Sequence, residues 1–207
     1  MHPEICEFIS WLSYDGKLSS TDDCSQRKVA ASGELTGTGL RYIPVQHSGS
    51  SQYSRAEALV IAKCCLELLE KDSTVTTLKG ANRDVVTRSL VAADILVVAP
   101  YNLAVQEIAK VVPEGVRVGT VDKFQGQEAP VVFYAMTCSS AEDAPRGMSF
   151  LFDDHRLNVA ISRAQCLAVL VANPRLLDAP ARTIEQLELV NGVCELVSRA
   201  QEVEVIV

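Results

Sequence analysis

The stretch "VGTVDKFQGQEAPVV", residues 118–132, places a dense polar segment between two apolar runs. The flanking segments 116–121 and 131–137 are predicted to be buried β-strands. A plain connection between two strands needs only a turn, whereas this one carries hydrogen-bonding side chains around a glycine. The composition therefore indicates a functional loop. Its polar residues and glycine are Thr120, Asp122, Lys123, Gln125, Gly126, Gln127 and Glu128.

Strands and helices alternate along the rest of the chain. Ser54 and Glu57 form a capping box before an apolar run that ends at Leu69, so a helix is expected there, and Asn102 is expected to cap another. Short apolar, β-branched runs predict further strands at 40–45, 95–99, 166–172 and 203–207. Amphipathic patterns predict helices at 2–12, 102–112, 153–164 and 183–200.

This alternation, with strands that are apolar throughout, is typical of a parallel sheet buried on both faces. The sequence predicts an α/β fold, a doubly wound and mostly parallel sheet with helices on both faces, in one domain spanning residues 1–207. Ligands of such sheets bind beyond the carboxyl ends of the strands. By this rule Pro100–Asn102, Thr120–Glu128 and Asn173 all lie at that edge.

Two segments interrupt the alternation. Residues 19–39 are polar and rich in glycine, and residues 72–92 carry turn residues and charges, so both are predicted to be irregular surface insertions. The glycines of the first segment lack the spacing of a dinucleotide-binding loop.

Composition sets limits on function. The chain has 207 residues and a net charge of −7, which argues against nucleic-acid binding by a general basic surface and leaves only local sites. No apolar run approaches the roughly 20 residues of a membrane span, and no secretory signal is recognisable. A cytoplasmic protein without a membrane partner is expected. The seven scattered cysteines are expected to be small buried hydrophobes, with no metal site.

A second polar concentration lies in "DDHRLNVAISRAQ", residues 153–165. On a helix, Arg156, Ala160 and Arg163 fall near one face. An amphipathic helix with solvated arginines would explain this pattern without any function.

Taken together, the segments resemble the second motor domain of superfamily 1B helicases of the Upf/Dna2 type. "MHPEICEFISWLSYDGKLSS" is similar to the segment that follows the middle motifs of the motor, and "ILVVAPYNLAVQEI" to motif IV. "VGTVDKFQGQEAPVVFYAMT" is similar to motif V, and "RLNVAISRAQ" to motif VI. The order and approximate spacing match over nearly the whole chain. The resemblance is closest to bacterial helicases that follow a RecB-like nuclease region.

The resemblance implies a RecA-like fold and ATP hydrolysis between two such domains during movement along single-stranded DNA or RNA. The first domain of the family binds ATP and Mg²⁺ through a phosphate loop and an acidic residue. This chain has no Gly-x-x-x-x-Gly-Lys-Ser/Thr sequence. The chain is therefore expected to be a fragment that partners a first RecA-like domain, with or without a fused nuclease domain, and to be inactive alone. A short regulatory protein or a remnant is the alternative.

The resemblance also assigns roles at the nucleotide. Arg163 matches the arginine finger, whose planar guanidinium stabilises charge on the γ-phosphoryl group. Glu128 matches the glutamate that accepts hydrogen bonds from ribose hydroxyls. Gly126 lets the backbone approach the nucleotide, and Gln125 braces the loop. Arg156 either ties motif VI to neighbouring loops or forms a structural salt bridge.

Nucleic acid is expected to contact Thr120 through its hydroxyl and neighbouring backbone N–H groups. Pro100, Tyr101 and Asn102 match the motif IV loop, which touches the strand in the family. Tyr101 either stacks on a base or packs within the protein.

Two charged residues of motif V have expected roles that do not involve the nucleotide. Asp122 is expected to cap the motif V turn. Lys123 either approaches a phosphate or is solvated. The alternative function for the whole chain is a non-catalytic nucleic-acid-binding or regulatory module with a helicase fold. Retention of Arg163 and Glu128 argues against that alternative.

Overall fold

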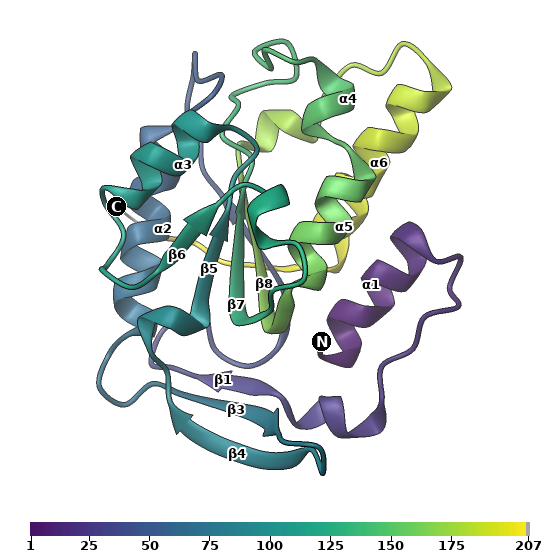
Figure 1. The fold of residues 1–207 in the computed structure, drawn as a ribbon. Coiled ribbons are helices and arrows are strands. Elements are labelled where there is room, and N and C mark those ends of the chain that lie inside the picture. The colour runs from purple at the N-terminus through teal and green to yellow at the C-terminus, as the bar shows by residue number, and fades with distance from the viewer. Residues whose placement is uncertain (206–207) are drawn as a thin grey trace.

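A six-stranded parallel sheet forms the centre of the computed structural model, which describes residues 1–205 (Figure 1). The strand order is β6-β5-β7-β8-β2-β9, and every neighbouring pair is parallel. The strands are β2 (Gly39–Pro44), β5 (Ile95–Val98), β6 (Arg117–Gly119), β7 (Ala129–Ala135), β8 (Ala164–Ala172) and β9 (Gln201–Glu202). The predicted parallel α/β fold is confirmed. Residues 206–207 of the predicted last strand lie outside the described residues.

Helices cover both faces of this sheet (Figure 1). One face carries α2 (Arg55–Leu68) and α3 (Asn102–Ala109), and the other carries α1 (Pro3–Ser13), α5 (Asp154–Ser162) and α6 (Ile184–Arg199). A short helix, α4 (Met148–Leu151), precedes α5. Every residue of β5 and β7 is buried, because these central strands lie between the two helix layers. This explains their continuous apolar sequence.

Helix α3 corrects one detail of the prediction. Asn102 is the first helical residue, and Tyr101 occupies the N-cap position without a side-chain cap. The helix therefore starts directly after the buried Pro100–Tyr101 pair. The exposed Asn102 does not cap it.

The prediction of an irregular loop at 72–92 is wrong. Strands β3 (Thr74–Lys79) and β4 (Asp84–Ser89) form a hairpin there. β3 also pairs with β1 (Lys28–Ala30), so part of the 19–39 segment is ordered as well, after the 3₁₀ helix η1 (Asp22–Gln26). Figure 1 shows this small antiparallel sheet below the amino ends of the main strands.

The hairpin was missed because its outer strand is polar. β4 buries no residue fully, so it lacks the apolar run that marks a core strand. The turn holds two residues of positive φ, Gly80 and Arg83, and Arg83 forms an ion pair with Asp23 of η1. The hairpin tip is thus anchored on the 19–39 segment.

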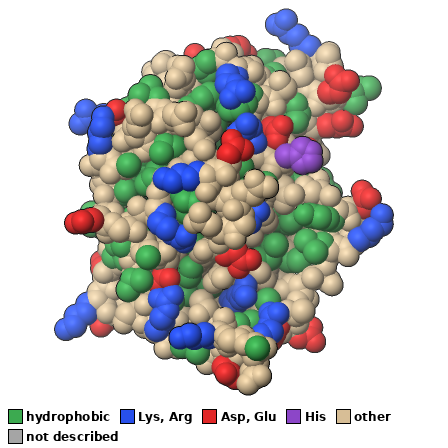
Figure 2. Space-filling model, viewed as in Figure 1, with side chains coloured by type: hydrophobic (Ala, Val, Ile, Leu, Met, Phe, Trp, Pro, Cys, Tyr) green, Lys and Arg blue, Asp and Glu red, His purple; other side chains and the backbone are tan. Residues whose placement is uncertain are grey.

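The cysteines, the helix lengths and the surface charges can be compared with the expectations from composition. All seven cysteines are unpaired and six are buried, which confirms their expected packing role. No helix within residues 1–205 is long and apolar enough to cross a membrane. Figure 2 shows acidic and basic side chains interspersed over the visible face, so the net charge of −7 does not form a single acidic field there.

Candidate functional site

The loop of residues 120–128 runs along the sheet from the carboxyl ends of the strands, here called the carboxyl edge, to their amino ends, the amino edge. β6 ends at Gly119 and β7 begins at Ala129, and β5 lies between these two parallel strands. Thr120 therefore lies at the carboxyl edge and Glu128 at the amino edge, about 20 Å apart along the strand direction for a strand of this length. The expectation that the whole segment lies beyond the carboxyl ends is wrong.

Gly126 is needed in this loop for its backbone conformation. Its φ is +80°, in the region that favours glycine, and a Cβ added there would meet no atom within 4 Å. The side of Gly126 where a Cβ would stand is therefore open, and a ligand can approach the backbone there.

Lys123 and Gln127 brace the loop. The Lys123 ammonium donates to the Val118 carbonyl at 3.1 Å, so it is folded back rather than freely solvated. The Gln127 amide donates to the Lys123 carbonyl at 3.4 Å and accepts from Arg117 at 3.2 Å. The side chain of Gln125 is exposed and has no partner among the described residues, so its predicted bracing role is wrong.

Asp122 also departs from its expected role. The 3₁₀ helix η3 (Asp122–Phe124) has Val121 at its N-cap position, and no side chain caps it. The Asp122 backbone carbonyl accepts from Gln125 N, but its carboxylate is exposed.

Arg163 and Glu128 meet at the amino edge. The Arg163 carbonyl accepts from the Ala129 N–H at 3.0 Å, directly beside Glu128. Arg163 Nε donates to the Val159 carbonyl at 3.1 Å, which fixes the half-buried side chain at the end of α5. The exposed Glu128 carboxylate accepts from Gln165 Nε2 at 3.0 Å. Gln165 is a residue of this site that sequence reasoning missed.

A shallow pocket of about 290 Å³ adjoins Glu128 at this edge. Met1, Thr21, Arg27 and Arg83 are among its lining residues. The Nε and Nη1 atoms of Arg27 are buried without a hydrogen-bond partner among the described residues. The 19–39 segment and the hairpin therefore bring the cations Arg27 and Arg83 next to Glu128. The prediction that both segments are irregular loops could not show this arrangement.

The carboxyl edge holds the residues expected to contact nucleic acid. Thr120 is partly exposed and Asn102 is exposed, whereas Pro100 and Tyr101 are buried. The Tyr101 ring packs on Phe150 with centroids 5.4 Å apart, and its hydroxyl lies 3.8 Å from Cys138 Sγ. Burial raises the pKa of Tyr101. Of the two roles considered for Tyr101, the structure supports the packed one.

Arg156 also belongs to this edge. Its guanidinium lies 4.2 Å from the centre of the Phe150 ring, so it ties α5 to α4 through a cation–π contact. Within residues 1–205 it forms no ion pair, so the structure does not contain the alternative salt bridge.

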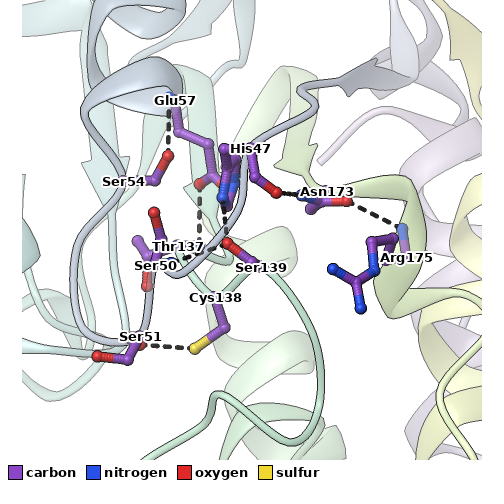
Figure 3. Close-up of polar contacts among 10 residues, drawn as sticks. All are labelled: His47, Ser50, Ser51, Ser54, Glu57, Thr137, Cys138, Ser139, Asn173 and Arg175. Carbon is purple, nitrogen blue, oxygen red and sulfur yellow. Dashed lines mark hydrogen bonds and ion pairs between the residues drawn. The ribbon is translucent and has the colours of Figure 1, made fainter.

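A buried polar network at the same edge escaped the sequence prediction (Figure 3). Ser54 caps α2 as expected, accepting from Glu57 N at 3.2 Å. The Glu57 carboxylate instead accepts from Thr137 N at 2.9 Å and lies 2.9 Å from His47 Nε2. It is fully buried, and burial raises its pKa. The capping box is therefore only half formed.

Both ring nitrogens of His47 have partners in this network. His47 Nδ1 lies 2.8 Å from Ser139 Oγ, which also accepts from Ser50 N at 2.9 Å. His47 Nε2 lies 2.9 Å from the Glu57 carboxyl group. Asn173 joins the network by donating to the His47 carbonyl at 2.6 Å. The network links the ends of β2, β7 and β8 to the start of α2 (Figure 3).

The parallel order of the sheet and its two covered faces define an α/β domain of the RecA-like class. A family model described as an AAA domain matches residues 1–175, which is most of the chain. The chain belongs to this AAA domain family.

The curated relatives that the chain matches include proteins named as helicases and proteins named as regulators of nonsense transcripts. The chain is 27% identical over 85% of its length to the putative helicase mov-10-B.2 of Danio rerio. It is 30% identical over 86% of its length to regulator of nonsense transcripts 1 of Dictyostelium discoideum. It spans only 19% and 13% of these two proteins. Neither organism is bacterial, so these relatives do not support the expected closeness to bacterial helicases. A fused nuclease domain remains an expectation from the resemblance.

Proposed function

We propose that this chain is the second motor domain of an ATP-dependent DNA or RNA helicase or translocase. The observation that carries the proposal is the convergence of Arg163 and Glu128, from two separate motifs, at the amino ends of β7 and β8. Helicases among the relatives of similar sequence support it.

The residues at the amino edge suit a nucleotide shared with another domain. Arg163 presents a half-buried, permanently charged guanidinium for the phosphoryl oxygens that gain charge during transfer. Glu128 offers an exposed carboxylate for ribose hydroxyls, and the backbone at Gly126 is open to approach. ATP is thus the proposed substrate.

We do not assign a magnesium site to the residues of this chain. Within residues 1–205 no group of three or more acidic, histidine or cysteine side chains is placed to hold a metal ion. We assign Mg²⁺ and the phosphate loop to a first RecA-like domain, and expect the isolated chain not to hydrolyse ATP.

Single-stranded DNA or RNA is the proposed partner at the opposite edge. Thr120, Pro100 and Asn102 lie there, at the carboxyl ends of β5 and β6. The crossing loop 120–128 therefore joins the nucleotide edge to the nucleic-acid edge.

Steady-state kinetics of the complete helicase containing this chain test the proposal. Arg163→Ala should lower kcat by about 10³-fold or more with nucleotide binding retained, because a finger acts on charge developed in the transition state. Glu128→Ala should raise KM more than it lowers kcat, since a ribose contact is present before and during reaction.

Thr120→Ala is the matched control at the other edge. It should leave basal ATP hydrolysis unchanged and weaken its stimulation by single strands. Normal turnover by Arg163→Ala, or hydrolysis by the isolated chain that depends on Arg163, would show that the proposed half-site is wrong.

A further inference from the structure

Two arginines flank a single aromatic ring at the carboxyl edge. The guanidinium of Arg146 lies 3.7 Å and that of Arg156 4.2 Å from the centre of the Phe150 ring. Two guanidiniums this close to one centre cannot share a face without overlapping, so the ring separates them. Phe150 therefore acts as a rigid spacer between two positive charges.

Neither arginine is neutralised by the protein. Within the described residues 1–205, no carboxylate lies within ion-pair distance of either guanidinium. Nearby acids have other partners: Asp153 accepts from the backbone N–H of Arg156, and Asp143 accepts from Ser140. Holding two like charges at one ring is unfavourable without an anion, and here it occurs in a chain of net charge −7.

The pair lies beside the proposed nucleic-acid edge. Phe150 packs on Tyr101 at 5.4 Å, and Tyr101 follows β5 at its carboxyl end. Arg146 is exposed, whereas Phe150 and Arg156 are half-buried. Figure 2 shows basic, acidic and hydrophobic side chains together in the upper part of this face.

We propose that Arg146, Phe150 and Arg156 form a phosphate clamp for single-stranded nucleic acid. The two guanidiniums, set apart by the ring, bind successive phosphates of the backbone without reading sequence. The clamp extends the Pro100–Asn102 and Thr120 edge across α4 and the start of α5. This inference rests on the proposed function, because that function places the strand at this edge.

Binding of fluorescent 15-residue oligo-dT and oligo-U to the full chain, followed by anisotropy between 50 and 300 mM salt, tests the clamp. Arg146→Ala should weaken binding by about tenfold at low salt. It should also lower the slope of log affinity against log salt by about 0.7, as expected for one lost phosphate contact on a single strand. Phe150→Leu should weaken binding with Arg146 and Arg156 both intact, because the spacer is lost.

Lys71→Ala is the matched control, since it removes one exposed positive charge after the end of α2 at the far edge. If Arg146→Ala and Lys71→Ala gave equal affinities and slopes, the clamp would be overturned. Absence of any oligonucleotide binding, or equal competition by poly-glutamate, would overturn it as well.

A further variant separates the clamp from the proposed function. Arg163→Ala should bind oligonucleotides as the unaltered chain does, while abolishing turnover in the complete helicase. Loss of turnover in Arg163→Ala together with unchanged binding in Arg146→Ala would reject the clamp and keep the motor assignment. Arg156→Lys, which keeps the charge, should bind better than Arg146→Ala if charge dominates the contact.

Discussion

The carboxyl group of Glu57 is fully buried, yet both of its oxygens have partners. One faces His47 and the other accepts from the backbone of Thr137. Glu57→Ala should leave His47 Nε2 and the Thr137 N–H without these partners in the interior, and each lost partner is costly. We expect a loss of about 3 kcal/mol in the free energy of unfolding, measured by urea denaturation.

Glu57→Gln is the conservative comparison. Its amide oxygen can still accept from Thr137 N, so the loss should be clearly smaller than for alanine. Equal destabilisation by glutamine and alanine would mean that the Thr137 contact contributes little to stability.

At the scale of single elements, the turn after β7 holds an unfavourable backbone conformation. Thr137 has a φ of +65°, and its buried hydroxyl oxygen has no partner among the described residues. Thr137→Gly should stabilise the protein by up to about 1 kcal/mol, because glycine adopts positive φ without strain and the unpaired hydroxyl is removed. Thermal unfolding compared with Thr137→Ala checks this. A glycine variant less stable than the alanine variant would contradict the strain argument.

The elements also show which parts of the fold can be predicted from sequence. The core strands were predicted to within a few residues, because burial on both faces leaves an apolar run such as Ile95–Val98. The β3–β4 hairpin was not, because a strand that is exposed leaves little hydrophobic pattern. The valines and threonines on either side of Gly80 were the available signal.

For the molecule as a whole, buried thiols should make stability fall in alkali. Burial raises the pKa of Cys64 and Cys166 to about 12 and that of Cys138 to about 11. In the unfolded chain these thiols ionise near their ordinary value of 9.0. The unfolded state therefore loses protons first, and stability falls as pH rises from 9 to 11.

The expected decline is roughly 1 kcal/mol per thiol for each pH unit in that window. Urea midpoints at pH 8, 9 and 10 under reducing conditions measure it, and Cys64→Ala should give a shallower dependence. Stability that stays constant from pH 8 to pH 10 would rule the effect out.

The residues of the site could be predicted where a local sequence motif marks them, but not where the topology of the sheet places them. The motifs named Arg163 and Glu128, and the structure brings them together. The assignment of Glu128 to the carboxyl edge failed because a connection between two successive parallel strands must return from the carboxyl end of the first to the amino end of the second. β6 and β7 are both parallel to β5, so the loop between them makes this return. Gln165 and His47 were missed because their contacts, with Glu128 and Ser139, join residues far apart in the sequence and have no local signature.

The crossing loop has a consequence for how this chain can vary. From Thr120 to Glu128 it covers about 20 Å along the strands and passes β5 as well. Most of its length is folded into turns. Lys123 N donates to the Thr120 carbonyl, and Gln127 N donates to the Phe124 carbonyl. Such turns advance only about 2 Å per residue, so the loop has little length to spare. We therefore expect its exposed side chains to be exchangeable, whereas a deletion would break a turn or shift β6 against β7.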